Sequence, residues 1–288
     1  MKKVGFIVNM KKKSAPAIAQ KVVNWFIEND IEIYLTNETA NILSLSNHGV
    51  NADDLFSMSE CILVFGGDGT LLNAARMAAD KNIPLLGINL GHLGFLTELE
   101  VDRIVHGLEE LNKGHYHIEE RMMLEARVYR NGKEVGDFHA LNDIVITKSA
   151  FARMIEMKAY VDNEFLSTYP ADGLIIASPT GSTAYSLSAG GPIVSPDLDV
   201  ILITPVCPHT LYARPVVISH DQSVKVELLS DICEVMLTVD GQDGFHLKVK
   251  DEIIVKKSDL TTKLIKFRDR SFYEILREKL KDGSKNRA

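Results

Sequence analysis

The sequence has few cysteines, and this scarcity excludes two kinds of stabilising framework. Only Cys61, Cys207 and Cys233 occur among 288 residues, and they are widely separated. Their odd number and the absence of C-x-x-C spacing exclude a disulfide scaffold and a cysteine zinc site. We interpret Cys61 as a small core residue in a strand. A reducing, cytoplasmic setting fits this composition.

The sequence also lacks a long apolar run. At the N-terminus only residues 4–10, most of them apolar, separate Lys3 from Lys11. This segment is too short to span a membrane and carries no small-residue cleavage pattern. We therefore expect neither a signal peptide nor a membrane partner. The chain shows no internal repeat and no low-complexity tract.

Positive charge is in deficit as well. Lysine and arginine number 32 against 39 aspartates and glutamates, which gives a net charge of −7. This balance argues against nucleic acid or an anionic membrane as a partner. An anionic substrate would need local help from backbone N–H groups, Mg²⁺ or a few placed cationic side chains. The length of 288 residues suggests about two domains.

The most informative segment is Cys61–Asn73, which reads Cys-Ile-Leu-Val-Phe-Gly-Gly-Asp-Gly-Thr-Leu-Leu-Asn. Its apolar start predicts a buried strand, and Thr70 is expected to cap a helix over Leu71–Ala79. Glycines between a strand and a helix let backbone N–H groups approach phosphate oxygens. A carboxylate such as Asp68 suits such a site only if it binds a cation, accepts a proton or orients a hydroxyl. The pattern favours phosphoryl transfer, although a plain tight turn is the alternative.

The N-terminal part alternates strands with helices, which predicts a doubly wound parallel α/β domain. Ligands of such sheets bind at the carboxyl ends of the strands, where Gly66–Thr70 and Gly87–Gly94 would line one crevice. The glycine loop is neither a Walker A loop nor a Gly-x-Gly-x-x-Gly fingerprint. The expected elements are strands at 3–8, 31–35, 61–65 and 83–88 and helices at 15–28, 71–79 and 101–111.

The C-terminal part instead carries many short strands with turn signals between them, which predicts a β-rich, sandwich-like domain. An amphipathic helix at 272–281 could return to the first domain. We expect domain one over 1–120 with the helix at 270–282, and domain two over 121–269. The expected strands lie at 122–129, 140–146, 155–161, 165–169, 173–177, 200–203, 216–218, 224–229, 235–239 and 252–255.

A second unusual segment follows the apolar run Leu174–Ala177. Ser178–Gly191 consists largely of small hydroxyl residues and glycines, which fill a core poorly. Such a segment can instead wrap N–H and hydroxyl groups around a polar ligand, and Tyr185 could offer its ring to a base. A long structured loop without a ligand is the alternative, but loops of this length are often functional.

With these motifs in place, the sequence resembles the bacterial NAD kinases over nearly the whole chain. The Thr-Gly-Ser-Thr-Ala-Tyr-Ser run is specific, whereas lipid kinases and phosphofructokinases share the Gly-Gly-Asp-Gly string. The order and spacing of the motifs match the family as well. The segments that carry the resemblance are Gly66–Thr70, Gly87–Gly91, Leu141–Asp143, Ser178–Gly191 and Pro208–Pro215.

The resemblance implies transfer of a phosphoryl group from ATP to NAD, giving ADP and NADP. It also implies an active site between an α/β and a β-rich domain, and a homo-oligomer, either dimer or tetramer. Asp68 would be the catalytic residue, close to the ribose 2′-hydroxyl. Mg²⁺ would be carried by the ATP phosphates, with no metal site of the protein's own.

The resemblance and the loop pattern together name the site residues. Asn142 and Asp143 would hold the adenosine part of NAD, and Asp172 would face the nicotinamide end. The full set of expected NAD contacts is Asp68, Gly69, Asn73, Asn142, Asp143, Arg153, Asp172, Thr183, Ala184, Tyr185, Ser186, Leu187, Ser188 and Gln242. The N–H groups expected to cradle the ATP phosphates are those of Gly66, Gly67, Gly69 and Thr70.

Three positions depart from the family pattern. Asp143 is one methylene shorter than the usual acid, and Pro170 and Asn73 stand where basic residues are common. We expect these changes to alter the contacts to the NAD phosphates more than the reaction class.

Two other functions compete with this interpretation. A diacylglycerol- or sphingosine-type lipid kinase would carry a Gly-Thr-x-Asn-Asp stretch and a route for a lipid, whereas this chain has the hydroxyl-rich run. A non-catalytic NAD(P)-binding sensor would keep the glycine loops but would not need Asp68. Without the family resemblance, Asn142-Asp143 would be interpreted as a turn, and Asp172 and Arg153 as exposed surface charges.

Overall fold

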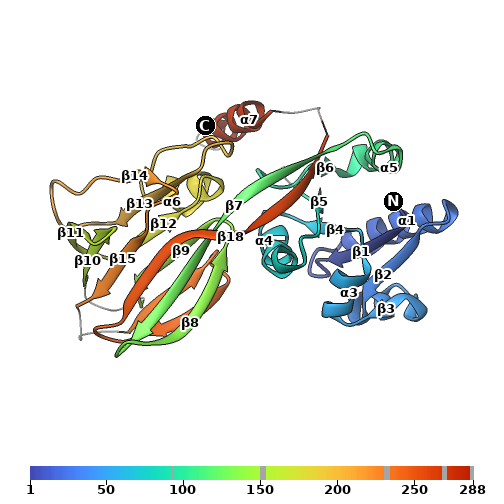
Figure 1. The fold of residues 1–288 in the computed structure, drawn as a ribbon. Helices are drawn as coiled ribbons and strands as arrows, with labels where there is room; N and C mark the ends of the chain where they lie inside the picture. Colours follow the sequence, from blue (N-terminus) through green and yellow to red (C-terminus); the bar gives the residue numbers. More distant parts are fainter. Residues whose placement is uncertain (92–93, 150–153, 230–233, 268–270, 286–288) are drawn as a thin grey trace. The chain divides into compact units, whose positions relative to one another are not determined.

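In a computed structural model, the chain of this protein divides into two units (Figure 1). Unit 1 comprises Met1–Glu120 and Thr262–Ala288, and unit 2 comprises Arg121–Thr261. The structure describes residues 1–91, 94–149, 154–229, 234–267 and 271–285. The chain leaves unit 1 within strand β7 (His117–Arg130) and returns within strand β18 (Glu252–Lys266).

Unit 1 is built on a parallel sheet with the strand order β3-β2-β1-β4-β5. The end of β18 joins the sheet in parallel, with Leu264 opposite Leu85. The strands are β1 (Lys3–Val8), β2 (Glu32–Thr36), β3 (Gly49–Val50), β4 (Cys61–Gly66), β5 (Leu85–Asn89) and β6 (Leu99–Glu100). The helices are α1 (Ala15–Glu28), α2 (Asn37–Ile42), α3 (Ala52–Met58), α4 (Asp68–Ala78), α5 (Ile104–Lys113) and α7 (Phe272–Lys285).

Helices cover both faces of this sheet, as the alternating pattern predicts. Cys61, Leu63 and Phe65 of β4 pack in one core cluster with residues of α1 and α5. On the other face, Gly5 and Gly87 leave room for Leu55 of α3 and Leu71 of α4. The doubly wound expectation for the N-terminal part is therefore confirmed.

Helix α4 begins earlier than the sequence predicted. It starts at Asp68, and Gly67, in an extended conformation, is its N-cap without a side-chain hydrogen bond. Thr70 lies inside the first turn, so its predicted role as a helix cap was wrong. The start places the Asp68 carboxylate at the positive end of the helix dipole.

Unit 2 consists of two groups of antiparallel strands around one core. A six-stranded sheet has the order β14-β13-β12-β9-β16-β17. The strands β11-β10-β15-β18 pair in that order, and β7 pairs with β8 and β18. One buried cluster takes residues from both groups, so the β-rich prediction is confirmed. The remaining strands are β8 (Lys133–Ala140), β9 (Asp143–Lys148), β10 (Ile155–Val161), β11 (Glu164–Ala171), β12 (Gly173–Ala177), β13 (Val200–Val206), β14 (Val216–Ser219), β15 (Val224–Leu228), β16 (Val235–Val239) and β17 (Asp243–Leu247).

The single strand predicted over residues 140–146 is in fact two strands. β8 ends at Ala140 and β9 begins at Asp143. The strand pairing is interrupted at Leu141-Asn142 because the backbone N–H groups of both residues donate to the Asp240 carboxylate instead. This break matters because it presents Asn142 at the end of a sheet strand.

A buried ion pair in unit 2 yields a stability prediction. The fully buried Asp251 carboxylate accepts from Arg130 Nε at 2.9 Å and Nη2 at 2.7 Å, and from the Lys248 N–H at 2.8 Å. In the Arg130→Ala variant this charge would stay buried without its partner. We expect the free energy of unfolding, measured in urea, to fall by about 3–5 kcal/mol. The exposed Lys133→Ala is the control, and a loss below about 1 kcal/mol for Arg130→Ala would contradict this account.

Candidate active site

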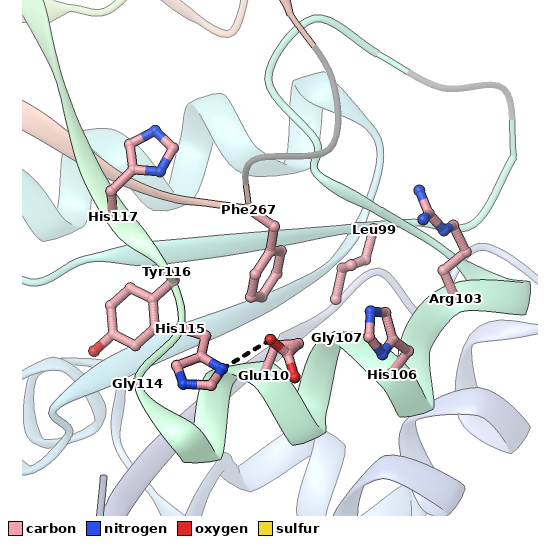
Figure 2. Close-up of a pocket in the computed structure, with 10 residues that line it drawn as sticks. All are labelled: Leu99, Arg103, His106, Gly107, Glu110, Gly114, His115, Tyr116, His117 and Phe267. Atoms are coloured by element: carbon pink, nitrogen blue, oxygen red, sulfur yellow. Dashed lines mark hydrogen bonds and ion pairs between the residues drawn. The ribbon is translucent and has the colours of Figure 1, made fainter.

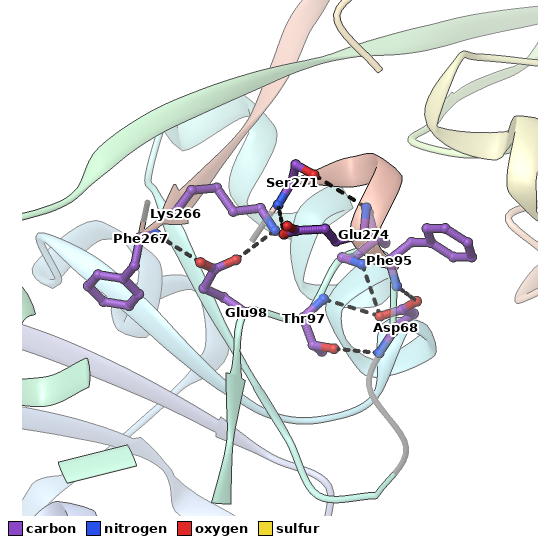
Figure 3. Close-up of polar contacts among 10 residues, drawn as sticks. Asp68, Phe95, Thr97, Glu98, Lys266, Phe267, Ser271 and Glu274 are labelled. Atoms are coloured by element: carbon purple, nitrogen blue, oxygen red, sulfur yellow. Dashed lines mark hydrogen bonds and ion pairs between the residues drawn. The ribbon is translucent and has the colours of Figure 1, made fainter. Parts of the chain in front are cut away.

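Asp68 is held in place by three backbone amides from the loop after β5 (Figure 3). Its Oδ2 accepts from the Phe95 N–H at 2.7 Å, and its Oδ1 accepts from the N–H groups of Leu96 and Thr97 at 3.2 Å. The carboxylate therefore has a fixed direction at the start of α4. A carboxylate offers about four lone-pair positions, so roughly one remains for a further donor.

Gly94 makes this arrangement possible. A Cβ on Gly94 would lie 1.8 Å from Asp68 Oδ1 and 2.2 Å from its Cγ. The Gly94 N–H donates to Thr97 Oγ1 at 3.1 Å, which helps to close the loop around the carboxylate. The sequence predicted that Gly87–Gly94 and the first glycine loop line one crevice. No pattern in the sequence indicated that Gly94 contacts Asp68.

The first glycine loop is anchored to β1 and to the end of β5. Asn9 Nδ2 donates to Thr70 Oγ1 at 3.1 Å, and the Leu90 N–H donates to the Gly66 carbonyl at 2.9 Å. Gly66 is needed because its Cβ would lie 2.2 Å from Thr70 Oγ1. The Thr70 N–H already donates to the Gly67 carbonyl at 3.0 Å. Binding of the ATP phosphates by the backbone N–H groups of Gly66, Gly67, Gly69 and Thr70 stays a prediction.

A nearly buried ion pair supports the loop that holds Asp68. Glu98 follows this loop directly and pairs with Lys266 Nζ at 2.8 Å, and its other oxygen accepts from the Phe267 N–H at 2.8 Å (Figure 3). The two side chains are only 11% and 9% exposed. Helix α7 begins nearby with a capping box, in which Ser271 and Glu274 each accept from the other's N–H.

In unit 2 the Asp240 carboxylate organises the Asn142-Asp143 segment. It accepts from the N–H groups of Leu141, Asn142 and Asp143 at 3.1, 2.7 and 3.1 Å. Asp143 is buried, and burial together with the charge of Asp240 raises the pKa of Asp143 to about 7. Sequence reasoning missed Asp240, although it lies two residues before Gln242, which was named.

The start of the hydroxyl-rich run packs directly on this segment. Ser178 Oγ donates to the Leu141 carbonyl at 2.5 Å and accepts from the Gly181 N–H at 3.2 Å. A Cβ on Gly181 would lie 2.1 Å from the Asn142 carbonyl oxygen. The structure thus brings together two segments that the sequence proposed for NAD binding. Ser178 follows Asn142 by 36 residues in the chain.

The other residues named for the dinucleotide site differ in exposure. Ser186 is fully buried and shares a hydrogen bond with Thr204 Oγ1 at 2.9 Å, whereas the Tyr185 side chain is exposed. The Thr183 hydroxyl donates to the Thr180 carbonyl at 3.3 Å. Of the remainder, Ala184 and Leu187 are half-buried and Ser188 is exposed. None of these observations tests the contacts to NAD.

The remaining predicted contacts are Asp172, Asn73, Gln242 and Arg153. Asp172 pairs with Lys148 Nζ at 3.0 Å in unit 2, and Lys148 was not named from the sequence. Asn73 is exposed on α4 of unit 1, and Gln242 is exposed in the turn after β16. Arg153 lies outside the described residues.

A cavity of about 460 Å³ opens in unit 1, and no residue predicted for the site lines it (Figure 2). His115 Nδ1 and Glu110 Oε2 lie 3.0 Å apart at its edge, within hydrogen-bond distance. Its lining residues are Leu99, Arg103, His106, Gly107, Glu110, Gly114, His115, Tyr116, His117 and Phe267. We place the candidate site at Asp68 instead, because the glycine loops and the fixed carboxylate meet there.

Two kinds of feature are absent from the described part of the chain. Within it, no three histidine, cysteine, aspartate or glutamate side chains gather closely enough to hold a metal ion. Likewise, none of its described helices has the length and apolar character needed to cross a membrane.

Comparison with known families gives two matches that together span most of the chain. Residues 4–116 match the ATP-NAD kinase N-terminal domain, and residues 141–267 match the ATP-NAD kinase C-terminal domain. Among solved structures, yeast NADH kinase complexed with NADH superposes with a TM-score of 0.89 at 26% identity, over 97% of this chain and 87% of that one. An NAD kinase from Archaeoglobus fulgidus in complex with ATP has a TM-score of 0.75 at 23% identity, over 97% and 98%.

Curated relatives are closer in sequence. An NAD kinase of Natranaerobius thermophilus is 50% identical over 283 residues, which cover 98% of this chain and 99% of that protein. An NAD kinase of Caldanaerobacter subterraneus subsp. tengcongensis is 49% identical over 280 residues, which cover 97% and 99%. With both domain models matched and relatives aligned end to end, the chain belongs to the NAD kinase family.

Proposed function

We propose that the protein is an ATP-dependent NAD kinase, which transfers the γ-phosphoryl group of ATP to the 2′-hydroxyl of the adenosine ribose of NAD. The observation that carries this proposal is the fixed Asp68 carboxylate at the start of α4, beside two glycine loops. Relatives named NAD kinase at about half identity over nearly the full chain support the same reaction.

Asp68 is proposed to orient the 2′-hydroxyl and to accept its proton. Three amide donors fix the carboxylate, and the lone-pair position that they leave can accept from the hydroxyl. A carboxylate is a weak base, but the transition state of phosphoryl transfer is loose and the proton leaves late. Positioning and charge stabilisation therefore matter more than base strength.

The remaining proposed contacts to ATP and NAD come from segments of each unit. In unit 1, N–H groups of the Gly66–Thr70 loop are proposed to bind the ATP phosphates. In unit 2, Asn142, Asp143 and the run Thr183–Ser188 are proposed to bind NAD, with Asp172 and Gln242 as further contacts. The packing of Ser178 and Gly181 on Leu141-Asn142 supports this grouping.

Mg²⁺ is proposed to arrive on the ATP phosphates. Asp68 already accepts from three amides, so roughly one lone-pair position of its carboxylate is left for another group. Bound to the phosphates, the ion would neutralise their charge. We also propose a cytoplasmic homo-oligomer, either dimer or tetramer, as the motifs imply.

A direct comparison of acceptors tests the proposal. Purified protein is incubated with ATP and Mg²⁺ and with NAD, NADH or diacylglycerol vesicles, and NADP is detected with an NADP-specific dehydrogenase. We expect NADP from NAD and no phosphorylated lipid. A phosphorylated lipid without NADP would favour a lipid kinase. NAD binding without any product would favour a sensor.

Asp143 gives the protein a predicted pH dependence of stability. Its folded-state pKa of about 7 lies above the ordinary value of 3.8, so the folded state keeps a proton that the unfolded state loses. Stability should therefore fall as pH rises from about 4 to about 7. Relative to Asp143→Asn, we expect the wild type to lose roughly 2–3 kcal/mol of unfolding free energy between pH 5 and pH 8. Urea unfolding curves at four pH values measure this, and parallel pH profiles for the two proteins would refute it.

A further inference from the structure

Lys12 lies where three parallel strands of unit 1 end. Its backbone is fixed in the turn between β1 and α1, because the Lys12 N–H donates to the Asn9 carbonyl at 3.1 Å and the Lys12 carbonyl accepts from the Ala15 N–H at 3.0 Å. The Asn9 N–H in turn donates to the Phe65 carbonyl at 2.9 Å, which ties this turn to the end of β4.

The Lys12 ammonium group sits over both glycine loops. A Cβ on Gly91 would lie 3.2 Å from Lys12 Nζ, and a Cβ on Gly67 would lie 4.0 Å from it. Gly91 is itself fixed by Asn89, whose side chain accepts from the Gly91 N–H and donates to the Gly91 carbonyl, both at 3.1 Å. The absence of side chains at these two glycines leaves the ammonium group next to bare backbone.

Within the described part of the chain, the Lys12 ammonium group has no carboxylate partner. Among the ion pairs between described residues, none includes Lys12, although its side chain is half-buried. In a chain of net charge −7, a lysine directed at two glycine loops and without an ion-pair partner among the described residues points to an anionic ligand. Its neighbours Lys11 and Lys13 are exposed instead.

We infer that Lys12 binds the phosphate oxygens of the phosphoryl donor, ATP, and thereby adds a side-chain cation to a site otherwise described by backbone N–H groups. This inference rests on the proposed function. It places the triphosphate against the ends of β1, β4 and β5, between the N-terminus of α4 and the Asn89–Gly91 turn. A lysine ammonium acts there as a point charge with three rotatable donors.

The test compares Lys12→Met with two matched controls, Lys11→Met and Lys13→Met. A non-hydrolysable ATP analogue, AMP and NAD are titrated separately, and steady-state rates are measured with each substrate varied. We expect Lys12→Met to weaken binding of the ATP analogue by roughly 10–100-fold, since it removes a hydrogen bond between charged groups. AMP and NAD binding and the melting temperature should match the wild type. Lys12→Arg should recover most of the loss, because it keeps the charge.

Two results would overturn the inference. One is unchanged binding of the ATP analogue to Lys12→Met, and the other is weakened NAD binding with ATP binding intact, which would assign Lys12 to the acceptor. The proposed function fails separately, if the wild type binds the ATP analogue but forms no NADP. In that case the analogue titration still decides the role of Lys12.

Discussion

The Asp68→Asn variant should form NADP at least about 100-fold more slowly than the wild type at saturating ATP and NAD. The substitution removes the charge that would accept the 2′-hydroxyl proton. It also turns an amide NH₂ toward either Phe95 N–H or the N–H groups of Leu96 and Thr97, where only an acceptor fits. Initial rates from the coupled dehydrogenase assay measure the effect.

The control for this variant is Asp80→Asn. Asp80 follows α4, is exposed and pairs only with Lys81 among the ion pairs of the described residues. It should keep the wild-type rate. A melting curve separates lost chemistry from lost folding, since an unmatched buried donor costs about 1–3 kcal/mol. If Asp68→Asn turned over within a few-fold of the wild type, Asp68 would not be the proton acceptor.

Gly94→Ala should also abolish most of the activity, by displacing the Asp68 carboxylate. The added methyl group would occupy space 1.8 Å from Oδ1, so either Asp68 or the 94–97 loop must move. Misplacing a reacting group by about 1 Å can cost roughly 100-fold in rate. We also expect a loss of about 1–3 kcal/mol in unfolding free energy from overpacking.

A double-mutant cycle isolates the cause of this loss. The three atoms nearest to a Gly94 Cβ all belong to the Asp68 side chain. In an Asp68→Ala background the Gly94→Ala change should therefore cost much less stability than in the wild type. Equal costs in the two backgrounds would show that Gly94 is needed for another reason.

The strand–glycine–helix order of residues 61–79 was sufficient to predict that Asp68 lies at the junction of a buried strand and a helix. The apolar run, the paired glycines and the helical periodicity are local signals, and each acts within a few residues. The start of α4 was misplaced because Gly67 serves as the cap, whereas hydroxyl residues such as Thr70 are the commoner caps. Helices α2 and α3 were missed because each is shorter than two full turns of clear periodicity.

The contacts that complete the candidate site could not be predicted in this way. Asp68 meets residues 27 to 29 positions further along, and Asp240 meets residues 97 to 99 positions earlier. Such pairs are created by the sheet topology and leave no periodic pattern in the sequence. Lys12 was overlooked for the same reason, since among three adjacent lysines only the fold distinguishes the one directed at the glycine loops.

The most direct test of the central claim follows the phosphoryl group itself. Protein is incubated with NAD, Mg²⁺ and ATP labelled at the γ-phosphate, and the products are separated. We predict that the label appears in NADP, one phosphate for each ADP formed, and that an NADP-specific dehydrogenase accepts the labelled product. Label found only in inorganic phosphate, or retained in ATP while NAD stays bound, would contradict the assignment of this protein as an NAD kinase.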